Sequence, residues 1–224
     1  MQALLLLALF PGLALAAPVT YPLDPERSEL VALTHPAGFL SGVSHAHAIA
    51  ARDLSGEVVY DAEAPEHSRV EVRLPTASLE NDDPALRERF HLGGTLSEGD
   101  RRKVSESMRS RGQLDVERYP EISFTSSEVR RLEDGRLEVT GLLRLHGVAG
   151  RINVPVRVWV EGEVLRGEGS VRISQRAYGI EPFSTGLGTV RNADPIELRI
   201  ALVGRAAPPL PTGTGRAPAE EESP

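Results

Sequence analysis

The chain has 224 residues, a formal net charge of −7 and no cysteine. The absence of cysteine excludes disulfides, thiolate metal sites and cysteine nucleophiles. The acidic balance argues against a nucleic-acid-binding protein, because such proteins normally carry a basic face.

Residues 1–16 predict a secretory signal peptide. The segment from Leu4 to Phe10 is apolar but too short to span a bilayer. Ala14 and Ala16 occupy the small-residue positions that precede a cleavage site, so we expect a cut between Ala16 and Ala17. A buried N-terminal strand is the alternative reading of the apolar segment. The signal peptide predicts a periplasmic or secreted protein with no transmembrane segment in the mature chain.

Strands with one buried face dominate the middle of the chain, because apolar and polar residues alternate there with a period of two. The alternating apolar sets are Val70, Val72 and Leu74; Ile152, Val154, Val156, Val158 and Val160; and Ile196, Leu198, Ile200 and Leu202. Further extended segments are expected at residues 28–34, 40–51, 54–60 and 164–174. The total is about eight or nine strands, which suits an antiparallel sandwich or a small barrel.

Two local features interrupt this pattern. Asp134-Gly135 predicts a hairpin turn, because the pair tolerates the positive φ that such a turn requires. Pro155 lies inside an alternating strand and cannot donate a ladder hydrogen bond, so we expect a sheet edge or a bulge there.

One or two short helices are predicted between the strands. Asp83-Pro84 provides an N-cap and a first-turn proline, and a second helix is expected to begin after Ser97 and run to Arg111. The domain therefore spans residues 17–205. Residues 206–224 form a tail rich in proline and glutamate that is expected to be disordered.

Catalytic signatures are missing from the sequence. It contains no nucleophile elbow, no phosphate-binding loop and no dinucleotide fingerprint. We therefore predict a protein that is not an enzyme and that needs no cofactor.

His45 and His47 are the pair of residues best suited to bind a metal. On a strand, residues two apart face the same side with Cα atoms about 7 Å apart, so two imidazoles can approach one ion. A stable site needs further ligands, which the spacing does not supply. The favoured interpretation is two rings on a partly polar face. A metal- or haem-associated accessory protein using His45 and His47 is the alternative.

Several short motifs resemble the YceI-like family when they are taken in order. They are Tyr119-Pro120 with Phe124 and Ser126, then Gly141, Leu143, Gly147 and Val148, then Arg176, Gly179 and Ile180. Tyr21-Pro22-Leu23-Asp24 and the segment 54–61 are similar to the opening strands of that family. The His-rich segment 44–47 and Ala149 depart from its pattern.

The resemblance implies an all-β fold, an eight-stranded antiparallel lipocalin-like barrel that is exported and carries a polyisoprenoid or similar amphiphile. The apolar side chains expected to line its cavity are Ile122, Phe124, Val139, Leu143, Val154, Val156, Val158 and Phe183. His45, His47 and Arg176 are expected at the polar end of the ligand. Whether the protein is a monomer or a homodimer stays open at this point.

Overall fold

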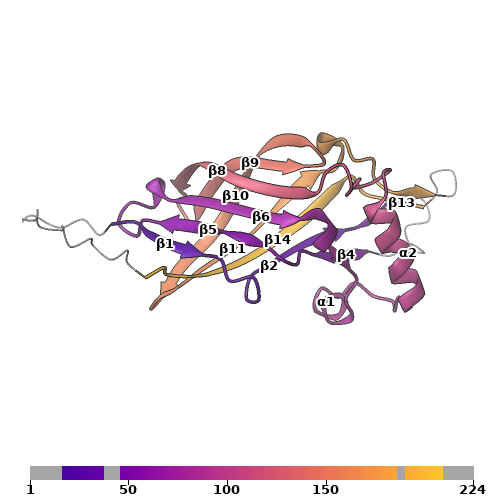
Figure 1. Cartoon of the computed structure of the whole chain (residues 1–224), viewed down its shortest axis with the longest axis horizontal. Helices are drawn as coiled ribbons and strands as arrows, with labels where there is room; N and C mark the ends of the chain where they lie inside the picture. The colour runs from indigo at the N-terminus through magenta and orange to yellow at the C-terminus, as the bar shows by residue number, and fades with distance from the viewer. Residues whose placement is uncertain (1–16, 38–45, 186–189, 209–224) are drawn as a thin grey trace, which may run out of the picture.

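The computed structural model describes residues 17–37, 46–185 and 190–208. The expected signal peptide, His45 and the tail after residue 208 lie outside this range. Within it, the protein is all-β with few helices, as predicted. Most strands belong to one large antiparallel sheet that curls around its own inner face, as Figure 1 shows.

The described part of the large sheet has 11 strands, so the predicted count of eight is not confirmed. They are β1 (Val19–Pro22), β2 (Glu29–Thr34), β4 (His47–Ala50), β5 (Ser55–Tyr60), β6 (Arg69–Pro75), β7 (Glu80–Asn81), β8 (Glu121–Arg131), β9 (Leu137–Leu145), β10 (Val148–Glu161), β11 (Val164–Ser174) and β14 (Pro195–Arg205). A small three-stranded sheet contains β3 (Pro36–Ala37), β12 (Ser184–Thr185) and β13 (Val190–Asn192).

The higher count arises because three extended segments are interrupted. A turn separates β1 from β2, a short irregular stretch separates β4 from β5, and the 3-10 turn η3 (Thr76–Ser78) separates β6 from β7. The two parts of each segment keep the same neighbours, since β1 pairs with β5 while β2 pairs with β4. In the same way, β6 pairs with β5 and β7 pairs with β4.

The first and last strands of the described chain meet. β2 pairs with β14, and Leu23 forms an isolated bridge to Gly204. The backbone N–H of Ala207 also donates to the carbonyl of Thr20 at 2.9 Å. The curl of the sheet therefore brings the first segment of the described chain, which contains β1 and β2, against β14.

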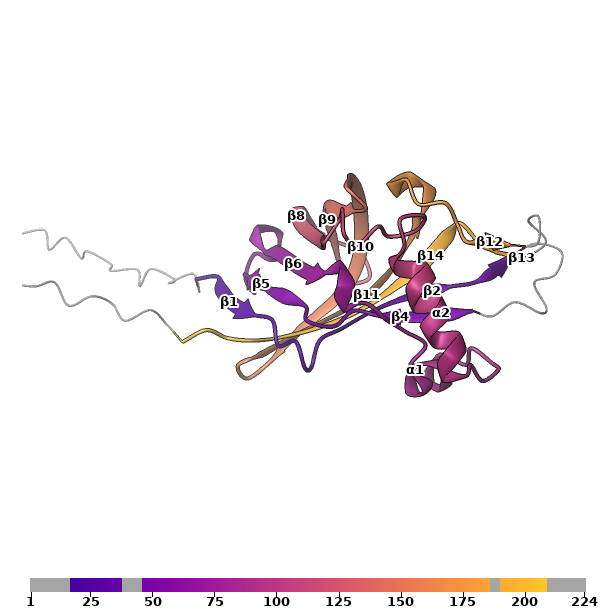
Figure 2. The same cartoon turned by 45° about the vertical axis from the view of Figure 1, so that its right-hand side comes forward.

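Two α-helices lie together at one end of the curled sheet. They are α1 (Pro84–Arg89), capped by the Asp83 carboxylate, and α2 (Glu98–Arg109), capped by the Ser97 hydroxyl, as the sequence predicted. Figure 2 shows α1, α2, β4, β12 and β13 at this end. We call it the α2 end; β1 and the last described residues lie at the opposite end. Two further 3-10 turns are η2 (Pro65–His67) and η4 (Arg176–Tyr178).

Pro155 lies in β10, a strand with neighbours on both sides. The sequence predicts a sheet edge or a bulge at this proline, and the pairing of β10 provides an edge there. β10 pairs with β9 along its whole first half, whereas its pairing with β11 begins only at Val156, opposite Gly169. Pro155 therefore stands where one of the two ladders stops, and residues 148–155 are an edge on the β11 side. We call the unpaired stretch between residues 148–155 and 170–174 the β10–β11 seam.

Gly56 is required where β5 pairs with β6. Its φ is +136°, and an added Cβ would overlap the backbone carbonyl of Glu71. Gly56→Ala is expected to lower the free energy of unfolding by about 2 kcal/mol, because L-residues reach this conformation only under strain. Chemical denaturation measures the loss. Gly167→Ala is the control: its Cβ would meet nothing within 4 Å and its φ is not positive, so an equal loss there would contradict the argument.

Candidate functional site

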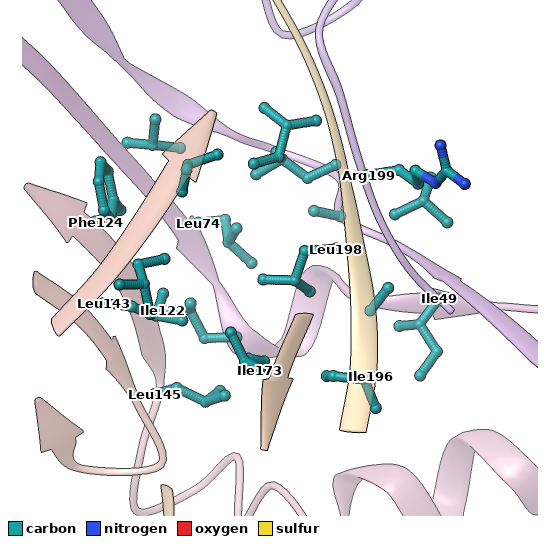
Figure 3. Close-up of a pocket in the computed structure, with 18 of the residues that line it drawn as sticks. Ile49, Leu74, Ile122, Phe124, Leu143, Leu145, Ile173, Ile196, Leu198 and Arg199 are labelled. Atoms are coloured by element: carbon teal, nitrogen blue, oxygen red, sulfur yellow. The ribbon is translucent and has the colours of Figure 1, made fainter. Parts of the chain in front are cut away.

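A cavity of about 460 Å³ lies inside the curled sheet. This volume falls in the ordinary range for sites that bind small molecules, roughly 300–1,000 Å³. Its wall is mostly Val, Leu and Ile from the inward faces of the strands. Figure 3 shows Leu74, Ile122, Leu143, Leu145, Ile173, Ile196 and Leu198 around it. Their side chains come from strands far apart in sequence.

The structure places all eight predicted cavity residues on this wall. They are Ile122, Phe124, Val139, Leu143, Val154, Val156, Val158 and Phe183. Seven of them follow from alternation, because the inward set of each strand is apolar. Whether these residues contact a ligand stays a prediction.

The glycine in the middle of β11 leaves space in the cavity. Gly167 is part of the wall, and it pairs with Val158 on one side and Leu202 on the other. A Cβ added there would meet no atom within 4 Å. The absent side chain at this position therefore adds to the open volume.

Six polar wall residues lie at the α2 end. Thr34 and His47 come from β2 and β4, Lys103 and Ser107 from α2, Gln113 from the segment after it, and Asn192 from β13. Two wall residues at this end are exposed to solvent: Phe183 at 41% and the Lys103 side chain at 79%. The α2 end of the cavity thus carries polar and solvent-exposed side chains, whereas most of the remaining wall is apolar.

The two faces of β4 have different surroundings, and His47 lies on the face that borders the cavity. Ala48 and Ala50 are buried against Leu86 of α1, whereas His47 and Ile49 line the cavity. The His47 backbone N–H donates to the Thr34 hydroxyl at 3.2 Å, which fixes the start of the strand against β2. The His47 side chain is 18% exposed.

A buried carboxylate holds the His47 ring. His47 Nδ1 lies 2.7 Å from Asp82 Oδ2, and the Asp82 side chain is fully buried. Asp82 has a φ of +56° and directly follows β7, where its backbone N–H donates to the Ala48 carbonyl. The backbone N–H of Ala48 in turn donates to Asp82 Oδ1 at 3.2 Å. The carboxylate is therefore fixed to the same strand that carries the histidine.

Arg87 of α1 neutralises this carboxylate. Its guanidinium donates to Asp82 Oδ1 at 2.8 Å and to the Ala46 carbonyl at 2.9 Å, and its side chain is 7% exposed. It also donates to the backbone carbonyls of Leu92, Gly93 and Gly94. Burial alone would raise the pKa of Asp82, but the hydrogen bond and charge of His47, with the bonds from Asn81 and Arg87, hold it below its ordinary value.

The predicted polar-end residues therefore have different outcomes. His47 lines the cavity, and His45 lies outside the described residues. Arg176, in η4, is not part of the wall: its exposed guanidinium lies 3.3 Å from Glu181, so the structure corrects its expected place at the cavity. Among the described residues no group of three His, Asp or Glu side chains is arranged to hold a metal.

Asp82, Arg87 and Lys103 are the site residues that sequence reasoning missed. Asp82 and Arg87 are separated from His47 by 35 and 40 positions, and no spacing rule connects them. Across the described residues, none of the helices is both long and apolar enough to cross a membrane.

Solved structures share this fold. A crystal structure of Burkholderia cenocepacia BcnA aligns with a TM-score of 0.61 at 21% identity, covering 81% of this chain and 98% of that one. A Campylobacter jejuni YCEI protein aligns with a TM-score of 0.52 at 14% identity, covering 70% of this chain and 83% of that one. At these identities the likeness concerns the fold alone.

Curated relatives match part of the chain. A UPF0312 protein of Azotobacter vinelandii is 28% identical over 136 residues, which is 58% of this chain and 62% of the relative. A UPF0312 protein of Pseudomonas syringae pv. syringae is 33% identical over 112 residues, 50% of this chain and 49% of the relative. The chain thus spans between about half and under two thirds of the length of these relatives. The model of the YceI-like domain matches residues 21–203, nearly all of the described domain, and the chain belongs to this family.

Proposed function

We propose that the protein is a non-enzymatic carrier that holds a polyisoprenoid or similar long-chain amphiphile inside a closed, lipocalin-like barrel. The observation that carries the proposal is the 460 Å³ apolar cavity, whose wall includes all eight side chains expected from the sequence. Sheet pairing supports the closed container, because the eight successive segments that contain the 11 strands each pair with two neighbours.

The cavity suits a chain better than a compact polar molecule. Its inner part offers aliphatic side chains and few hydrogen-bonding groups, so affinity must come from removing apolar surface from water. Each buried methylene contributes about 0.8 kcal/mol, so the affinity increases with the length of chain that the cavity holds, and a long chain is needed to offset the entropy of association. No charged contact along the chain is needed.

Polar groups at the α2 end set the direction of the ligand in this proposal. The chain lies toward the interior of the barrel, and the head group stays near His47 at the α2 end. Export through the predicted signal peptide is part of the same proposal, since an amphiphile carrier in the cell envelope moves lipids that water excludes.

Native mass spectrometry of the protein purified from cells tests the function. We expect a population whose mass exceeds that of the polypeptide by one hydrophobic molecule, which organic extraction removes. The extracted material, analysed by liquid chromatography, should show a long aliphatic or prenyl chain. If purified protein gave only the bare polypeptide mass, and the delipidated protein bound no added long-chain amphiphile, the carrier function would be refuted.

A further inference from the structure

The charges along the cavity wall have one sign. Among the wall residues that the structure describes, those that can carry a positive charge are His47, Lys103 and Arg199, and no aspartate or glutamate accompanies them. Arg199 lies on the side of β14 away from Leu198, as Figure 3 shows, and its guanidinium pairs with Glu197 at 2.6 Å. This leaves His47 and Lys103 as the basic groups at the α2 end of the cavity.

The contact with Asp82 indicates which nitrogen of the His47 ring carries a hydrogen. The pKa of Asp82 lies below its ordinary value, so the carboxylate is ionised and accepts the hydrogen that Nδ1 carries. Nε2 is then an acceptor in the neutral ring and a donor in the imidazolium. Within the described part of the chain, Nε2 has no hydrogen-bond partner.

The surrounding charges leave a protonated His47 uncancelled. Asp82 is the acidic group in contact with the ring, and its other oxygen is already paired with Arg87 at 2.8 Å. One carboxylate facing two cations gives this cluster a net positive charge when the ring is protonated. Lys103 lies 3.5 Å from Asp100 on the same helix, so its charge, like that of Arg199, is balanced by a neighbouring carboxylate.

We propose that His47 Nε2 binds the acidic head group of the amphiphile, a carboxylate or a phosphate, while Asp82 and Arg87 act as positioning residues. This inference rests on the proposed carrier function and names its ligand class. The head group and Nε2 share one proton: an O–H acid passes it to Nε2, or an anion meets the imidazolium, and the result is the same charge-assisted hydrogen bond. Such bonds are roughly twice as strong as neutral ones.

Three probes with the same ten-carbon chain distinguish the contribution of the head group to affinity from that of the chain. Decanoic acid, decyl phosphate and decanol are titrated against delipidated protein carrying the neutral dye Nile red, and displacement of the dye reports affinity. We expect at least one of the two acids to bind roughly tenfold more tightly than decanol, from the difference between a charged and a neutral hydrogen bond. Comparing the two acids distinguishes a fatty-acid head group from a phosphate.

His47→Gln tests the assigned residue, because glutamine can still donate to Asp82 but cannot carry a charge. It is expected to reduce the acid-to-alcohol ratio to near one while leaving decanol affinity within about twofold. His67→Gln is the matched control: His67 also lies near an aspartate, at 3.9 Å from Asp61, but its side chain is 76% exposed and outside the cavity wall. It should leave every affinity unchanged.

The outcomes separate the two proposals. Equal binding of the acids and decanol to the wild-type protein overturns the acidic head group and leaves the carrier function standing. Binding of none of the three probes refutes the carrier function itself. A preference for acids that persists in His47→Gln overturns the role of His47. Should that variant fail to fold, Lys103→Gln decides the assignment, because the exposed lysine can be replaced without disturbing the core. A preference for acids that is kept in Lys103→Gln supports His47, and a preference that is lost there overturns the role of His47.

Discussion

Gly167→Trp is expected to abolish amphiphile binding while the protein stays folded. The glycine lies on the cavity wall with no atom within 4 Å of an added Cβ, so the indole enters empty space and not packed core. Displacing even four methylene groups of the ligand costs about 3 kcal/mol, which is roughly a hundredfold in affinity. Nile red titration and native mass spectrometry measure the loss.

The control for this substitution is Gly112→Trp. Gly112 is an exposed glycine outside the cavity wall, and an added Cβ would approach only the Ser110 hydroxyl, at 3.9 Å. Dye affinity and thermal stability should remain those of the wild type. Binding that survives in Gly167→Trp, with its β-sheet circular dichroism spectrum intact, would show that ligands do not occupy the cavity.

Asp82→Asn is expected to destabilise the protein by about 3 to 5 kcal/mol, because it leaves the buried guanidinium of Arg87 without a counter-charge. The amide keeps the shape of the carboxylate, so a large loss reports the charge and not a cavity. Urea denaturation at neutral pH gives the value. Asp134→Asn is the control: Asp134 pairs with Arg136 on the exposed hairpin, and its removal should cause no measurable change.

The same carboxylate predicts how stability changes with pH. The folded-state pKa of Asp82 is lowered, so its contribution is fully present above the ordinary aspartate value of about 3.9 and is lost as the pH falls through the folded-state pKa. The gap in stability between wild type and Asp82→Asn should therefore narrow in acid. A gap that stayed constant down to pH 2 would contradict this assignment.

Alternation allowed the cavity wall to be predicted from sequence. Residues such as Val154, Val156 and Val158 lie on one face because the side-chain period of a strand is two, and this rule needs no knowledge of the neighbouring strands. The motifs shared with the YceI-like family then indicated how those faces are arranged. Alternation within a strand and the order of motifs along the chain can both be observed in the sequence itself, and this is why they predicted the cavity wall.

The number of strands and the buried ion pair between Asp82 and Arg87 could not be predicted from the sequence in the same way. The breaks between β1 and β2 and between β4 and β5 interrupt segments that keep the same partners, and they depend on how the sheet curls in the assembled fold. Asp82 stands in the segment Asn-Asp-Asp-Pro, where the next aspartate is the visible helix cap. Nothing local distinguishes a carboxylate that will be buried under α1 from one that will face water.

The β10–β11 seam gives the barrel one wall that is fastened differently from the rest. From Val156 to Glu161, where β10 and β11 pair, the two strands are joined by backbone hydrogen bonds, whose length and direction are fixed. Along the seam, Ile152, Val171 and Ile173 belong to one apolar cluster, and Tyr178 of η4 packs beside Gly150. Apolar contacts resist sliding and separation less than a ladder does. A change in the distance between β10 and β11 along this line would therefore break no ladder hydrogen bond between them.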